Sequence, residues 1–536
     1  MIEVMNKSIS ILMVVAALFA TACNSQKKSV MSSALDKYAV VKIDKPDLSG
    51  ITDNGKEVLN LYKFAAREAD KIYWQQTFGD PAKLEGIADE ATREYAKVNY
   101  GPWDRRNGKA FVEGYGAMPA GANYYPADMT AEEFDALKDP AKTSPYTVIR
   151  RDAEGKLSAV WYHDAYAENI ETIVSCLKTA ADITIKPSVR NYLLKKIEAI
   201  QTDDYYASEL AWLDMTDSKM DLVLGPDEVT DDQLYGIKKS YEAFVLLKNL
   251  EKTAQLEKYA SKAAELQQAL PCKDEYKTFV PGERSNIFAC NALYYAGSAN
   301  EGTKLVAINL PFDEKVQKEV GTRTILMDNI ITAKFNKIIA LAAINLLDGA
   351  EDAVDRESFF WNIAFREVAH GLGVKQTLDG RHVATALGNM AETIEEAKGD
   401  ILGVYFATRL ADSHELSLLS NRKSSIATFL VSLIRSGRFG NAEPIGRGNI
   451  ICYNFLKEHG AFSRNPSGKY RIDYAKASEG IEGLSARLLE IQAKGDYNEA
   501  KAFVDKYSAI DKELEADFVN LRLEKIPIDL RFEYNW

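Results

Sequence analysis

Two helix-like segments decide the fold of this chain: WNIAFREVAHGLGVKQT at residues 361–377 and AETIEEAKGDILGVYFATR at residues 391–409. Both have a helical pattern, and a short polar gap separates them. Along the first helix, Arg366 and His370 would share one face, with Glu367 about 100° away. We therefore expect a polar site that is built on a pair of helices.

The first segment differs by one residue from the H-E-x-x-H helix of zinc hydrolases. In that helix, two histidines one turn apart bind Zn²⁺ and the glutamate activates a bound water. Arg366 stands at the first histidine, followed by Glu367 and His370. A guanidinium is charged at any working pH and has no lone pair for a cation. On the second segment, Glu396 and Asp400 lie one turn apart, where a third ligand and an acid that orients a histidine would be expected.

Length and composition indicate a large protein of ordinary globular type. The 536 residues exceed what one hydrophobic core supports, so two or more lobes are expected. The chain is 46% hydrophobic and 27% charged, with a net charge of −12. It has no basic block, zinc knuckle or glycine-rich phosphate loop, which argues against binding of nucleic acid or nucleotides.

The first 23 residues have the pattern of an export signal. A short polar region with Lys7 precedes an apolar run at residues 9–20, which is too short to span a bilayer. Small residues then lead to Cys23, an arrangement that resembles the lipobox of bacterial lipoproteins. A lipid on Cys23 would tether the protein to a membrane. We predict an exported lipoprotein facing the periplasm, with residues 24–50 as a tether; a plain signal peptide cut near Ala22 is the alternative.

Four cysteines lie beyond the export signal. An exported protein could oxidise them, and Cys272 and Cys290 are the two that lie near each other in sequence. We expect unpaired cysteines, with a disulfide between these two as the alternative.

Strand and helix patterns divide the rest of the chain. Residues 146–151 and 157–162 flank a turn and predict a hairpin, and residues 291–310 form a second β-rich region. Residues 231–270 and nearly all of the chain after Thr324 have a helical pattern. The prediction is an α+β, mainly helical fold.

Two lobes with a cleft between them follow from this pattern. A mixed α/β lobe is predicted over residues 51–324, with approximate boundaries, and it carries a small β-barrel or sheet. A helical lobe over residues 325–536 carries the helix with Arg366, which would face the first lobe across the cleft.

Longer stretches make a family likeness specific. The chain resembles the dipeptidyl peptidase III family of zinc aminopeptidases, in its bacterial branch with an H-E-x-x-H-G-L-G motif, over roughly residues 55–460. The stretches that carry the resemblance are ANYYPADMTAEEF, SPYTVIRRD, YYASELAWLDMTDSKMDLVLGPDE, YYAGSANEGTKLVAINLP and TAKFNKI. The resemblance implies two lobes with a wide cleft, a zinc helix in the helical lobe and a small β-barrel in the other.

The resemblance also assigns roles to residues at the metal position. His370 matches the second zinc ligand, Glu367 the general base and Glu396 the third ligand. Asp400 matches the acid that orients a histidine ligand without binding the zinc itself. Arg366 replaces the first ligand.

Substrate-binding positions are partly kept. Glu228 matches the acid that grips the amino terminus of the substrate, and Asn309 matches an asparagine that orders its backbone. Thr230 replaces a tyrosine that steadies the transition state, Phe312 replaces a second asparagine, and Ile445 replaces an active-site histidine. Together with the lost zinc ligand, these separated changes indicate relaxed catalytic constraint.

Each altered position also has a purely structural interpretation. Thr230 and Gln233 could form a helix capping box, and Phe312 and Ile445 could be packed apolar side chains. His382 is the alternative candidate for a replacement zinc ligand.

Electrostatics suggests what Arg366 does. Its cation could pair with Glu396 or Glu367 and replace Zn²⁺ as the positive charge between acids, or it could point to solvent. We predict that zinc is absent or weakly bound and that the chain is a catalytically impaired homologue, a pseudoenzyme. Its cleft would bind peptides or an envelope protein. The alternatives are an active zinc-dependent dipeptidyl peptidase that cleaves dipeptides from peptide N-termini, and a structural lipoprotein without a ligand.

Overall fold

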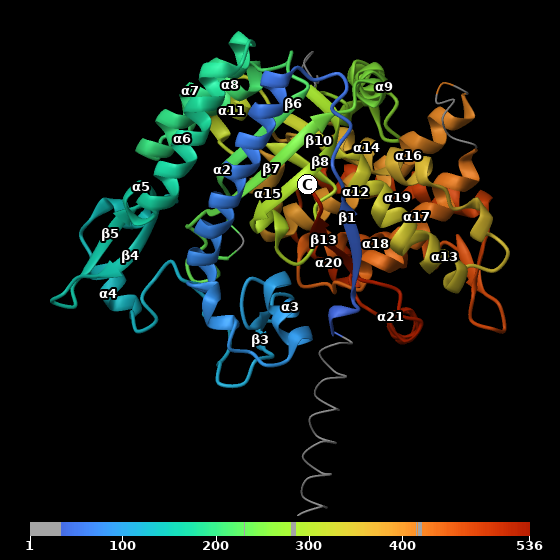
Figure 1. Cartoon of the computed structure of the whole chain (residues 1–536). Helices are drawn as coiled ribbons and strands as arrows, with labels where there is room; N and C mark the ends of the chain where they lie inside the picture. The colour runs from blue at the N-terminus through green and yellow to red at the C-terminus, as the bar shows by residue number, and fades with distance from the viewer. Residues whose placement is uncertain (1–33, 230, 280–285, 414, 416–420) are drawn as a thin grey trace, which may run out of the picture.

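The computed structural model describes residues 34–229, 231–279, 286–413, 415 and 421–536 (Figure 1). The predicted signal peptide, Cys23 and Thr230 lie outside these residues. The predicted α+β, mainly helical fold with a small sheet is confirmed. None of the described helices is long and apolar enough to cross a membrane.

A five-stranded sheet is the centre of the mixed part. Its strand order is β6-β7-β8-β10-β9, in which β10 pairs with β8 in parallel and the other neighbours are antiparallel. The sheet curls into a half-barrel. The strands are β6 Met220–Glu228, β7 Ser240–Lys248, β8 Asn286–Gly297, β9 Ala307–Leu310 and β10 Arg323–Met327.

The helical prediction for residues 231–270 is wrong in its first half. Strand β7 occupies residues 240–248, and helices α9 (Leu250–Ala260) and α10 (Ala263–Gln268) follow. Nearly every residue of β7 is buried, so the strand is buried on both of its faces. A continuous apolar run of this kind has no period-two alternation, so its pattern does not separate a buried strand from a helix.

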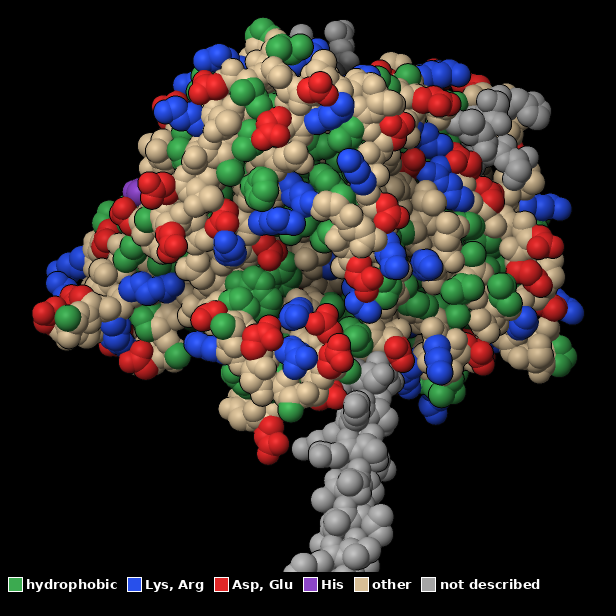
Figure 2. Space-filling model, viewed as in Figure 1, with side chains coloured by type: hydrophobic (Ala, Val, Ile, Leu, Met, Phe, Trp, Pro, Cys, Tyr) green, Lys and Arg blue, Asp and Glu red, His purple; other side chains and the backbone are tan. Residues whose placement is uncertain are grey.

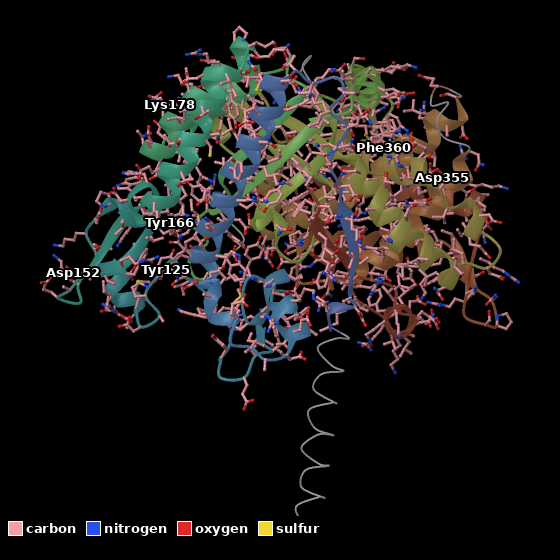
Figure 3. The ribbon with its side chains drawn as sticks, viewed as in Figure 1. Tyr125, Asp152, Tyr166, Lys178, Asp355 and Phe360 are labelled. Carbon is pink, nitrogen blue, oxygen red and sulfur yellow. The ribbon has the colours of Figure 1, made fainter. Side chains whose placement is uncertain are left out.

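Helices cover the sheet on one side. Helix α2 (Asp53–Thr77) packs against β7 and β8 and against α6 (Ala167–Ile183), as Figure 1 shows. The predicted hairpin is confirmed as β4 (Thr147–Arg151) and β5 (Leu157–Trp161), and Figure 3 labels Asp152 at its tip. The remaining elements here are α3 Glu90–Val98, β2 Trp103–Asp104, β3 Lys109–Ala110, α4 Ala131–Ala136, α5 Tyr162–Ala165, α7 Pro187–Thr202, α8 Tyr206–Asp214 and α11 Glu314–Glu319.

The chain after the sheet is helical, as predicted. Helix α16 (Ala391–Asp412) lies in its middle and contacts α14, α17, α18 and α19. Its buried residues occur all around the helix, which is typical of a central helix. The other elements are α12 Asp328–Lys334, α13 Ala340–Leu346, α14 Arg356–His370, α15 Val383–Leu387, α17 Arg422–Gly437, α18 Pro444–Glu458, β11 Phe462–Arg464, β12 Tyr470–Ile472, α19 Tyr474–Lys494, α20 Tyr497–Tyr507 and α21 Lys512–Leu523.

The tether prediction for residues 24–50 is wrong at residues 38–43, which form a strand. Strand β1 (Tyr38–Ile43) pairs in parallel with the last strand, β13 (Asp529–Tyr534). Asp529 is fully buried between Lys334 and Arg435, each at 3.0 Å from its Oδ2. The start of the described chain is therefore fixed to its end and, through β13, to the helices.

The surface and the cysteines carry few special features. Lys and Arg side chains are interspersed with Asp and Glu on the face in Figure 2, without a block of one sign. The four cysteines after residue 23, Cys176, Cys272, Cys290 and Cys452, are free, as expected, and Cys290 and Cys452 are buried.

Candidate functional site

Helix α14 is held firmly against α16. Asp355 caps its N-terminus by accepting the backbone N–H of Ser358 at 2.8 Å, and Phe360 and Trp361 are fully buried (Figure 3 labels Asp355 and Phe360). On α16, Gly403 lies so close that a methyl group there would come within 2.8 Å of the carbonyl oxygen of Asn362. This close approach of two backbones places Arg366 against the acids of α16.

Arg366 makes three ion pairs. Its Nη1 lies 2.6 Å from Oε1 of Glu367, its Nε lies 2.9 Å from Oδ1 of Asp400, and its Nη2 contacts Oε2 of Glu396. The side chain is 22% exposed, so the expectation that it points to solvent is wrong. The pairs with Glu367 and Glu396 follow the electrostatic prediction, and the pair with Asp400 adds to it. We call these four residues the Arg366 cluster.

The charge of Arg366 offsets the charges of the acids around it. Burial alone would lower the pKa of Arg366, but the charges of Glu367, Asp400 and Glu396 raise it, so the guanidinium stays charged. Burial raises the pKa of Asp400 to about 6, because the attraction of Arg366 only partly offsets desolvation and Glu396 repels a second charge. The Oδ2 atom of Asp400 is buried without a hydrogen-bond partner.

His370 is held by an acid that sequence reasoning missed. Its Nδ1 lies 3.1 Å from Oε1 of Glu395, which also accepts Nζ of Lys398 at 2.8 Å, and Oε2 of Glu395 accepts Nε2 of Gln492 at 2.9 Å. Burial would raise the pKa of Glu395, but Lys398 and His370 hold it below its usual range. The signal in the sequence was the doublet Glu395-Glu396, whose members lie on different sides of α16.

As arranged, these side chains do not fit a zinc ion. A catalytic zinc takes three protein ligands, whereas here a guanidinium stands at the first position and holds Glu396. Within the described residues, no group of three or more His, Cys, Asp and Glu side chains is placed to hold a metal. His382 precedes α15 and is exposed, and it makes no polar contact with the Arg366 cluster. It does not replace the lost ligand.

A second group of acids lies where β6 ends. Burial and the neighbouring charge of Asp227 raise the pKa of Glu228. Burial raises the pKa of Glu242 on β7 well above its usual range, with Asp227 and Glu228 adding to the effect. Ser298 donates its hydroxyl to Oε2 of Glu242 at 3.0 Å. We call Asp227, Glu228 and Glu242 the acidic cluster.

Residues from both edge strands of the curled sheet line a cavity beside the acidic cluster. A small cavity of ≈ 20 Å³, with room for about one water, is lined by Asp227 of β6 and by Leu310 and Pro311 at the end of β9. Its wall also includes Glu209, whose Oε2 is buried without a hydrogen-bond partner. Burial raises the pKa of Glu209 to about 7. Residues of β6 and of the end of β9 thus border the same cavity, although these strands are opposite edges of the sheet.

Asn309 lies exposed on the edge strand β9, where its Oδ1 accepts the hydroxyl of Thr324 at 3.1 Å. The helix that Thr230 and Gln233 are predicted to cap does not form: residues 231–239 contain a turn and bends but no helix. Asp232 organises these turns by accepting backbone N–H groups from residues 234, 235, 237 and 238.

The packed interpretation of two apolar positions is also wrong. Phe312 is 42% exposed and Ile445 is 55% exposed. Ile445 lies in the first turn of α18, one turn before Gly448, where an added methyl group would come within 3.1 Å of Cβ of Glu396. Ile445 thus lies one turn before the residue that packs against Glu396, and Phe312 follows the end of β9 by two residues.

Known proteins match this chain over most of its length. A family model for peptidase family M49 matches residues 130–376. The structure of DPP III from Caldithrix abyssi is 32% identical, covers 93% of this chain and 98% of its own, and superposes with a TM-score of 0.87. Dipeptidyl-peptidase III from Corallococcus sp. strain EGB is 29% identical and covers 94% and 97%, with a TM-score of 0.81.

A plant protein also matches. Nudix hydrolase 3 from Arabidopsis thaliana is 29% identical over 577 residues, which span 95% of this chain and 74% of the plant protein. The extent of the bacterial matches, the family model and the two-lobe fold agree. This chain belongs to the dipeptidyl peptidase III family, peptidase family M49.

Proposed function

We propose that this chain is a dipeptidyl peptidase III homologue that is catalytically impaired and keeps a cleft for peptides. The observation that carries the proposal is the Arg366 cluster. The family is zinc-dependent in general, and the first ligand position here holds a guanidinium that is ion-paired to the residues matching the base and the third ligand.

The cluster opposes zinc chemistry in two ways. Zinc would have to displace Arg366 from three acids, after which the buried guanidinium would lack a partner. Glu367 accepts a hydrogen bond from Arg366, so its Oε1 is not free to take a proton from a water. We infer that zinc is absent or weakly bound.

Two features support peptide binding. Strand β9 is an edge of the sheet and pairs with β10 on one side, so an extended peptide can add to its other side through backbone hydrogen bonds. The acidic cluster lies beside the end of β9 and favours a positive charge, such as a free amino terminus. The alternative function, an active zinc-dependent dipeptidyl peptidase, has support from family membership alone.

Turnover of dipeptidyl substrates tests the proposal. The purified chain should release no dipeptide above background, with or without added zinc, while an active bacterial relative assayed in parallel should. Calorimetry should detect binding of short peptides with free amino termini, and N-acetylation should weaken it. Zinc-dependent turnover would establish the active peptidase instead, and failure of every peptide to bind would leave the structural lipoprotein.

We also propose that the chain is an exported lipoprotein anchored through Cys23. The support is the apolar run before a cysteine preceded by small residues. In cells that express the full chain, Cys23→Ala should move the protein from the membrane fraction to the soluble fraction. An unchanged distribution would contradict the anchor.

A further inference from the structure

Two exposed apolar side chains lie close along the chain to residues of the two charged clusters. Phe312 directly follows Pro311, which lines the cavity together with Asp227, and Ile445 lies one helical turn before Gly448, which packs against Glu396. Val229, which directly follows Glu228, is 41% exposed. Isolated exposed apolar residues are normal on a protein surface, but Phe312 and Val229 directly adjoin residues of the acidic cluster or of its cavity along the chain.

The backbone around Phe312 is held on both sides. Pro311 before it accepts Nε2 of Gln317 at 2.9 Å through its carbonyl oxygen. Asp313 after it caps α11 by accepting the backbone N–H groups of Lys315 and Val316 at 2.8 Å and 3.0 Å. A large ring on a fixed backbone can contact a ligand at little cost in conformational entropy.

The arrangement points to one kind of occupant. The acidic cluster complements the ammonium group of a peptide, the free side of β9 complements its backbone, and Phe312 and Val229 complement an apolar side chain close to that ammonium. A second copy of the chain carries the same net charge of −12 and the same acids, which disfavours self-association here.

We propose that the cleft selects extended peptides that have a free amino terminus and a large apolar side chain within their first residues, and that Phe312 determines this preference. The inference rests on the proposed peptide binding. It adds a ligand class and assigns a specificity role to a position at which the resemblance places an asparagine.

Calorimetry with matched pentapeptides tests the inference. The peptides are alanine pentapeptides with free amino termini in which the second or third residue is Phe, Leu, Lys or Asp. The wild-type chain should bind the Phe and Leu peptides about tenfold more tightly than the Lys and Asp peptides. Phe312→Asn should reduce this ratio to about threefold or less while the Lys peptide keeps its affinity.

Two further variants make the outcome specific. Phe64, 54% exposed on α2, contacts none of the site residues, so Phe64→Asn should leave the preference unchanged. Glu228→Gln should weaken all the peptides together. Equal affinities in the wild type, or equal weakening of apolar and polar peptides by Phe312→Asn, would overturn the inference but leave peptide binding intact. Binding of no peptide at all would overturn both.

Discussion

The Arg366 cluster and the acidic cluster differ in whether the chain supplies a cation to their carboxyl groups. Both gather three carboxyl groups in a partly buried place. In the first, the chain supplies its own cation, and Arg366 contacts all three acids. In the second, no ion pair within 4 Å joins Asp227, Glu228 or Glu242 to a cation of the described residues, and the pKa values of Glu228 and Glu242 are raised. The first site is thus closed by its own cation, whereas the second can accept one.

Removal of the internal cation should give the largest effect. Arg366→Ala leaves three buried acids without a partner and should lower the free energy of unfolding by about 3–5 kcal/mol at neutral pH. Urea denaturation measures the change. Arg381→Ala removes an exposed arginine paired with Asp379 at 2.8 Å and should cost less than about 1 kcal/mol. Equal costs for the two variants would show that the Arg366 cluster does not stabilise the fold.

Glu209, beside the acidic cluster, should make stability depend on pH. Its pKa rises from 4.5 to about 7 on folding, so the folded state binds its proton more tightly than the unfolded state. The resulting stability is present at low pH and is lost as pH rises through this range, by up to about 3 kcal/mol. Glu209→Gln cannot ionise, so its stability relative to wild type should increase between about pH 5 and about pH 8. A constant difference across this range would contradict the assignment.

The spacing of α14 and α16 should matter by a smaller amount. Gly403→Ala forces a methyl group against the carbonyl oxygen of Asn362 and should cost about 1–3 kcal/mol in thermal or urea unfolding. Gly483→Ala is the control, because a methyl group there would meet its nearest atom only at 4.0 Å. If both variants unfold alike, the close contact does not position Arg366.

The smallest expected effect concerns the acidic cluster. Glu228→Gln keeps the shape of the side chain but removes its charge, so peptides with free amino termini should bind about tenfold more weakly, or about 1.4 kcal/mol. N-acetylated peptides should bind equally to both forms. Salt should weaken the wild-type interaction more than that of the variant. Loss of affinity for acetylated peptides as well would point to a misfolded cleft.

Local spacing made part of the site predictable. The helical spacing within residues 361–377 and 391–409 suffices to predict that Arg366 pairs with Glu367 or Glu396. The third partner, Asp400, and the link from Glu395 to His370 depend on side-chain directions, which spacing does not determine. The exposure of Phe312 and Ile445 departs from the usual burial of large apolar side chains, so it could not be predicted from residue type.

The fold was predictable where elements are local. The hairpin β4–β5 and the helices after Thr324 follow from short-range patterns. Strand β7 could not be predicted in this way, because a strand buried on both faces has no alternation of polar and apolar residues. The pairing of β1 with β13 joins segments from opposite ends of the chain, and no local pattern contains that information.

Zinc content tests the central claim most directly. The purified wild-type chain, dialysed against zinc and then against buffer, should hold far less than one zinc per chain by mass spectrometry. Arg366→His restores the first ligand and releases Glu396, so its zinc content should rise towards one per chain, and His370→Ala in that background should abolish the gain. One zinc per wild-type chain, lost on His370→Ala, would contradict the account.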